Sequence, residues 1–94
     1  MRYIDVNWLH DLQDEPYRLV SEMGFDDFET RKLEFFRNGE VGFVTDKIYT
    51  KKTMLGFVEV PTLEEINSQE EFKGKTITQP EFELLWGQYA PSSS

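Results

Sequence analysis

The dipeptide Asn38-Gly39 constrains the fold more than any other part of this chain. It separates two apolar-rich segments, FETRKLEFFR and EVGFVTDKIY, and an Asn-Gly pair in that position is the strongest short-range signal for a β-hairpin. Both residues accept the positive φ of a type I′ turn, so we expect a two-residue turn. In that register the numbers of facing residues sum to 77, and Leu33, Phe35 and Val44 share one face. The sequence therefore predicts two antiparallel strands in the middle of the chain.

Three other segments have the composition of strands. Residues 3–10 alternate around Trp8 with a period of two, which is typical of a half-buried strand. Residues 17–23 follow as a second strand, and residues 51–57 are expected to add a short one. Together with the hairpin, these segments predict an antiparallel sheet of about four to five strands.

Two helices are expected after the strands. Thr62 with Glu65, and Thr78 with Glu81, have the spacing of a capping box, in which an N-cap hydroxyl and an acidic residue three positions on satisfy each other's backbone N–H. The first helix is expected to break near Gly74. The second carries a core-facing stripe made of Phe82, Leu85, Trp86 and Tyr89. The sequence therefore predicts an α+β fold with two C-terminal helices packed on one face of the sheet.

Length and composition indicate one small globular domain. The chain has 94 residues, so we expect a single domain over residues 1–90 and a disordered tail at 91–94. There is no Cys, which excludes disulfides and thiolate metal sites and favours a cytoplasmic location. The N-terminus lacks the pattern of a signal peptide, and no apolar run is long enough to span a membrane. We expect no cofactor, and a monomer or weak dimer.

The charge of the chain limits its partners. Eighteen acidic against ten basic residues give a net charge of −8. Direct binding to nucleic acid or to an anionic membrane needs a cationic surface, so neither is expected. The acidic charge either serves solubility alone or steers a basic protein partner toward the molecule.

The stretch VNWLHDLQDEP contains the single histidine of the chain, His10, beside Trp8 and the acids Asp11, Asp14 and Glu15. One hypothesis is a small enzyme or ligand-binding site in which His10 acts as a general base oriented by a carboxylate, together with Trp8, Asp11 and Glu15. The other is a strand end whose histidine hydrogen-bonds with the acidic loop. One His without Cys is a poor ligand set for zinc, and the loop lacks the spacing of a calcium site, so no metal is expected.

A second group of acids belongs to the first expected helix and the segment after it. These residues are Glu64, Glu65, Glu70 and Glu71. They form either a solvated face or a docking surface for a basic protein. A mimic of a polyanion is a third hypothesis, but the basic groups around Arg31 and Lys51 interrupt the acidic pattern.

Four motifs run in order along nearly the whole chain: W-x-H-D-x3-EP, E-x-RK-x-E-x-F-x-x-G, P-x-LEEIN and F-E-x-x-W. With them the chain resembles a family of small bacterial proteins of unknown function. Asn38 stands where an Asp-Gly turn is more usual in that family. No catalytic residues come with the resemblance.

The resemblance implies a cytoplasmic protein of a family in which some members are encoded beside polymorphic or contact-dependent toxins, as immunity proteins are. It therefore favours a non-enzymatic immunity protein that binds a cognate, basic toxin domain stoichiometrically. The expected contacts are Asp11, Asp14 and Glu15 of the loop and the four glutamates of the helical segment. The alternative remains a small enzyme or ligand-binding domain around Trp8 and His10.

Overall fold

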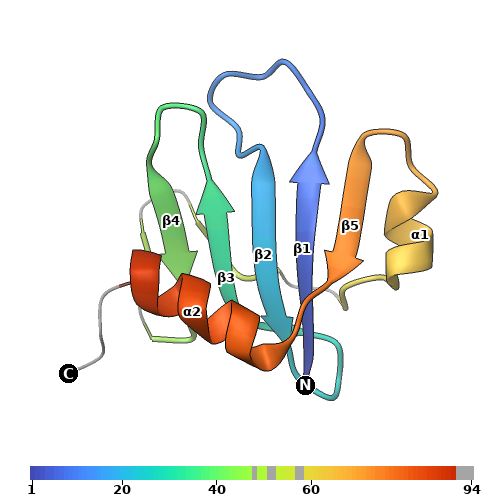
Figure 1. Cartoon of the computed structure of the whole chain (residues 1–94), viewed down its shortest axis with the longest axis vertical. Helices are drawn as coiled ribbons and strands as arrows, with labels where there is room; N and C mark the ends of the chain where they lie inside the picture. The colour runs from blue at the N-terminus through green and yellow to red at the C-terminus, as the bar shows by residue number, and fades with distance from the viewer. Residues whose placement is uncertain (48, 51–52, 57–58, 91–94) are drawn as a thin grey trace.

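A five-stranded antiparallel sheet and two helices make up the protein (Figure 1). The structure is a computed structural model, and it describes residues 1–47, 49–50, 53–56 and 59–90. Along the chain the elements are β1 (Arg2–Trp8), β2 (Arg18–Met23), β3 (Glu29–Phe35), β4 (Val41–Val44), α1 (Leu63–Asn67), β5 (Phe72–Thr76) and α2 (Gln79–Tyr89). The strand order is β4-β3-β2-β1-β5. The predicted α+β class and antiparallel sheet are confirmed, and within the described residues no helix has the length and apolarity to cross a membrane.

The hairpin forms at the predicted place, but with a three-residue loop instead of a two-residue turn. The Phe36 N–H donates to the Glu40 carbonyl at 3.0 Å, and residues 37–39 connect the pair. Of the loop residues 37–39, only Gly39 has a positive φ, of 93°. This combination is typical of a turn followed by a glycine bulge, the next commonest hairpin connection after the two-residue turns.

The longer loop shifts the pairing of β3 with β4 by one residue from the predicted register. Leu33 faces Phe43 and Phe35 faces Val41, so facing numbers sum to 76. A shift of one residue moves every side chain of a strand to the other face of the sheet. Val44 therefore does not share the face of Leu33, and Val41 and Phe43 pack against that core instead.

Strand β5 replaces the part of the first helix that was expected to reach Gly74. Helix α1 ends at Asn67, and residues 72–76 pair with β1. The Asn67 side chain donates to the Gly74 carbonyl at 3.0 Å and accepts from the Gly74 N–H at 2.6 Å. These two bonds fasten the short helix to the strand that follows it. The strand expected at 51–57 is absent from residues 53–56; its other residues, like the expected tail at 91–94, lie outside the described part.

The two helices lie on opposite faces of the sheet, not on one face as predicted. Phe82 of α2 packs with Tyr3 and Val20, whereas Ile66 of α1 packs with Ile4, which points to the other side of β1. The reason is the unpredicted strand between the helices. Helix α1 precedes β5 and packs on one face of the sheet, whereas α2 follows β5 and lies on the other, in front of the strands in Figure 1.

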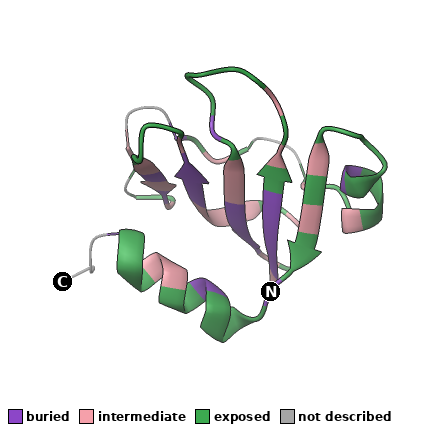
Figure 2. Cartoon of the chain, turned by 45° about the horizontal axis from the view of Figure 1, so that its top comes forward, coloured by how far each residue is buried: buried purple, intermediate pink, exposed green. Residues whose placement is uncertain are grey.

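Each face of the sheet therefore has a small core of its own, and buried residues follow one another without a break along parts of β1, β2 and β3 (Figure 2). The core under α2 consists of Tyr3, Val20, Leu33, Phe35, Ile77 and Phe82. The core beside α1 consists of Ile4, Val6, Met23 and Ile66. A reciprocal capping box between Thr78 and Glu81 starts α2, as predicted.

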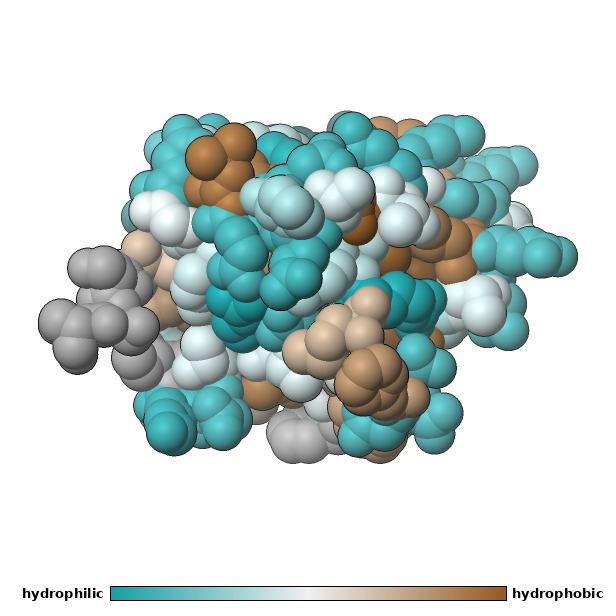
Figure 3. Space-filling model, turned by 60° about the horizontal axis from the view of Figure 1, so that its bottom comes forward, coloured by the Kyte–Doolittle hydropathy of each residue, from teal (hydrophilic) through white to brown (hydrophobic). Residues whose placement is uncertain are grey.

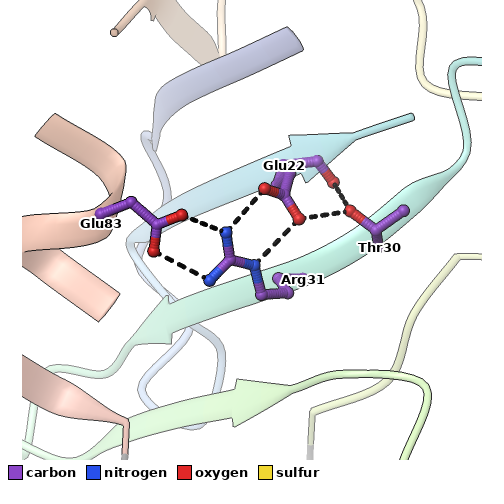
Figure 4. Close-up of polar contacts among 4 residues, drawn as sticks. All are labelled: Glu22, Thr30, Arg31 and Glu83. Carbon is purple, nitrogen blue, oxygen red and sulfur yellow. Dashed lines mark hydrogen bonds and ion pairs between the residues drawn. The ribbon is translucent and has the colours of Figure 1, made fainter. Parts of the chain in front are cut away.

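An ionic clamp, formed by Arg31 with Glu22 and Glu83, fastens α2 to the sheet (Figure 4). The guanidinium donates to both Glu22 oxygens, at 2.9 and 2.7 Å, and to both Glu83 oxygens, at 3.1 and 2.7 Å. It also lies 4.9 Å from the Phe82 ring centre and 5.1 Å from that of Trp86. The hydrogen bonds from Arg31 lower the pKa of Glu22 to about 2. The clamp therefore combines paired charges with cation–π contacts.

Candidate functional site

Three loops meet at one end of the sheet and form a surface that we call the acidic end. They are residues 9–17 between β1 and β2, residues 36–40 between β3 and β4, and residues 68–71 before β5, all at the top of Figure 1. The Leu9 N–H donates to the Glu71 carbonyl at 2.7 Å, and Arg37 donates to the carbonyl of His10. These bonds hold the first loop to each of the other two.

His10 fixes the conformation of the first loop. Its Nδ1 accepts from the Leu12 N–H at 2.9 Å, so Nε2 carries the ring proton and donates to the Pro16 carbonyl at 2.7 Å. The ring also lies on Trp8, with centroids 4.2 Å apart. Both ring nitrogens are thus occupied by backbone groups of the same loop. This arrangement matches the hypothesis of a strand-end histidine and leaves no ring nitrogen free for acid–base chemistry.

The loop that His10 holds presents apolar side chains among acids. Leu9 and Leu12 are 53% and 55% exposed. Asp11, Asp14 and Glu15 are exposed beside them. An apolar side chain in a fixed loop with charged neighbours is typical of a protein–protein contact.

The fold brings further predicted acids to the same end. Glu70 and Glu71 lie in the third loop, next to Leu9, whereas Glu64 and Glu65 are exposed on α1. With the three acids of the first loop and Glu40, the acidic end has six carboxylates against one guanidinium, that of Arg37. The predicted contact residues are therefore gathered at one end, except for Glu64 and Glu65.

The opposite end of the molecule differs in character. Figure 3 shows it with brown apolar groups separated by teal and white ones. Its most exposed apolar residue is Phe25, at 93%, in the turn after β2. Asp26 and Asp27 stand in the same turn, and Arg2 pairs with Asp27 at 3.4 Å.

An open cavity of about 490 Å³ lies against the inner side of the first loop. Its walls are the apolar side chains of Trp8, Leu19, Phe36 and Met54 and the carboxylates of Asp14, Glu15 and Glu34. Of the four residues in the ligand-site hypothesis, Trp8 and Glu15 line the cavity. Asp11 and His10 do not line it, although the His10 ring contacts the ring of Trp8.

Glu34 is the functional candidate that the sequence did not indicate. It is only 9% exposed, and burial raises the pKa of its carboxyl above the ordinary value. Its ionic partner is Lys32, whose Nζ lies 3.8 Å from Glu34 but 3.3 Å from Glu29. Its position in β3 could have indicated it, because that position places an acidic side chain on a buried face of the sheet.

Trp8 also carries an unusual polar group. Its Nε1–H is buried and has no hydrogen-bond acceptor. Buried donors are almost always satisfied in folded proteins, so this one is an exception. Within the described residues, no three His, Asp or Glu side chains are grouped so that they could hold a metal ion.

The fold and site define a small acidic α+β protein with a fixed, carboxylate-rich loop surface at one end. Residues 2–91 match the family described as a domain of unknown function (DUF6881), and the chain belongs to that family. No curated protein and no solved structure matches the chain.

Proposed function

We propose that this protein is a non-enzymatic binding protein of the cytoplasm, and that it acts as an immunity protein that neutralises a cognate bacterial toxin by stoichiometric binding. The observation that carries the proposal is the acidic end, where Leu9 and Leu12 stand exposed in a loop held by His10. A loop already fixed in one conformation loses little entropy on binding, which raises affinity.

The negative charge of the acidic end indicates which class of protein is the partner. The acidic end concentrates negative charge in a chain of net charge −8. Such a surface steers a basic protein toward it and disfavours acidic ones. A toxin domain that acts on nucleic acid is basic, and the resemblance to proteins encoded beside toxins favours a partner of that kind.

The experiment is affinity capture with the tagged chain from cells of the source organism, followed by co-expression of the captured protein with and without this chain. We expect a basic protein whose toxicity co-expression relieves. Asp11→Asn/Asp14→Asn should slow association by about tenfold at low salt and flatten its salt dependence, because steering acts on the rate of encounter. Glu70→Gln/Glu71→Gln should act in the same direction, and Glu64→Gln/Glu65→Gln less.

Asp26→Asn/Asp46→Asn is the matched control. It also changes the net charge from −8 to −6, but at the opposite end of the sheet. An asparagine in place of Asp26 would keep the side-chain oxygen that accepts from the Phe28 N–H. Equal slowing by both double variants, or capture of no basic protein, would contradict the proposal.

A further inference from the structure

We propose that the cavity beside Trp8 receives the cationic end of an arginine or lysine side chain from the protein partner. This inference rests on the proposed function, because it names the group that the partner inserts. The occupant is set by two features of the cavity: its charge and its aromatic walls.

The charge of the cavity wall is not balanced by the described residues around it. Lys32 is shared between two carboxylates, and it lies closer to Glu29 than to Glu34. Glu29 also accepts from the Ser21 hydroxyl at 3.1 Å and the Gly56 N–H at 2.7 Å. Glu34 has the 3.8 Å pair with Lys32, and the Thr53 hydroxyl beside it carries no charge. One negative charge is therefore left over, where an incoming cation would pair with Glu34.

The mouth of the cavity adds charge of the same sign. Asp14 and Glu15 line it from the loop, and both are exposed. Cations are thus attracted first by the exposed acids and then by the buried one. An anionic ligand would be repelled by three carboxylates, and a neutral ligand would gain no ion pair in return for desolvating them.

The apolar walls suit the rest of a long cationic side chain. Trp8 and Phe36 offer ring surfaces, and Leu19 and Met54 complete the apolar lining. Arginine and lysine side chains bury their methylene stems on such surfaces and place the charge beside aromatic rings. The Trp8 ring is held in place by Phe72, at 6.1 Å between centroids, on the side of the sheet core.

The test begins with n-butylguanidinium, a probe that copies the end of an arginine, and with n-butylurea as its neutral counterpart. Both are titrated into the full chain while the Trp8 indole signal is followed by NMR. We expect a saturable shift with the cation and none with the urea. Glu34→Gln should weaken binding of the cation by about tenfold, the usual effect of losing a charged hydrogen-bond acceptor.

Glu40→Gln is the control, because it removes one charge from the acidic end without touching this cavity. It should leave the affinity for n-butylguanidinium within about twofold, the size of a screened surface contribution. No shift of the Trp8 signal, an equal response to the urea, or equal weakening by both variants would overturn the inference.

A second experiment uses the captured partner protein. Glu34→Gln should weaken the complex, and an unchanged complex would overturn the inference even if the probe binds. If no basic partner exists but the cavity binds the probe in a Glu34-dependent manner, the proposed function fails while the cation site stands. The two failures are thus distinguishable.

Discussion

At the scale of single residues, the most informative side chain is His10, because its two ring nitrogens determine the shape of the binding loop. We predict that His10→Ala keeps the fold but loosens residues 9–16, since it removes the bonds to Leu12 and Pro16. A hydrogen bond of this kind contributes about 1 kcal/mol, so exchange of the Leu12 amide with solvent should accelerate by about fivefold. Amide exchange measured by NMR checks this.

The control in the same loop is Gln13→Ala. The Gln13 side chain makes only a 3.4 Å contact with the Asp11 carbonyl, and it is exposed. Its removal should leave the Leu12 amide unaffected. If the Leu12 amide exchanges at the same rate in His10→Ala as in the natural chain, other contacts fix the loop and His10 does not.

At the scale of elements, the sequence predicted those helices and strands that are determined by interactions between residues close together in the chain. The helix α2 is governed by its own capping box and apolar stripe, and it was predicted from both. Strand β5, with the sequence FKGKT, has a central glycine and two lysines and no apolar alternation. It exists because β1 supplies its hydrogen bonds and because Gly74 lets Leu63 approach closely. Such long-range pairing leaves no periodic pattern in the strand itself.

The element-scale prediction concerns the ionic clamp of α2. Arg31→Met should destabilise the protein by about 3–5 kcal/mol, because Glu22, with a side chain only 6% exposed, would keep its charge without a cationic partner. Glu83→Gln removes the outer, 44% exposed carboxylate and should cost less than about 1 kcal/mol. Urea unfolding at neutral pH measures both. Similar losses for the two variants would show that Glu22 does not depend on Arg31.

The same clamp predicts a dependence of stability on pH. The pKa of Glu22 is about 2 in the folded protein against an ordinary value of 4.5. A carboxyl with a lowered pKa stabilises the fold above its unfolded pKa, and that contribution is lost as pH falls from about 4.5 toward 2. Glu22→Gln should therefore be less stable than the natural chain at pH 7 and approach it at pH 2. A difference that stays constant from pH 7 to pH 2 would contradict this assignment.

At the scale of the whole molecule, the sequence predicted the kinds of residue in the candidate site better than their arrangement. Asp11, Asp14 and Glu15 are adjacent in the chain, so their common location followed from the sequence. Their meeting with Glu70 and Glu71 depends on strand β5, which was not predicted. The cavity depends on the order of strands and on Glu34, which faces Leu19 of β2 and is buried by contacts that are distant in the sequence.

The acidic end is also expected to lower the stability of the whole protein, and this effect can be measured. Six carboxylates beside one guanidinium repel each other, and residues placed for binding are often not the most stabilising ones. We predict that raising NaCl from about 0.02 M to about 0.2 M stabilises the protein, because the Debye length falls below about 10 Å and screens exposed charges more than the clamp. Asp11→Asn/Asp14→Asn should add about 0.5 kcal/mol at low salt and reduce the gain from NaCl. Asp26→Asn/Asp46→Asn, with the same net charge, should do neither, and urea midpoints at the two salt concentrations compare them. If both variants gain equally, the repulsion is a property of the total charge and the acidic end carries no excess of it.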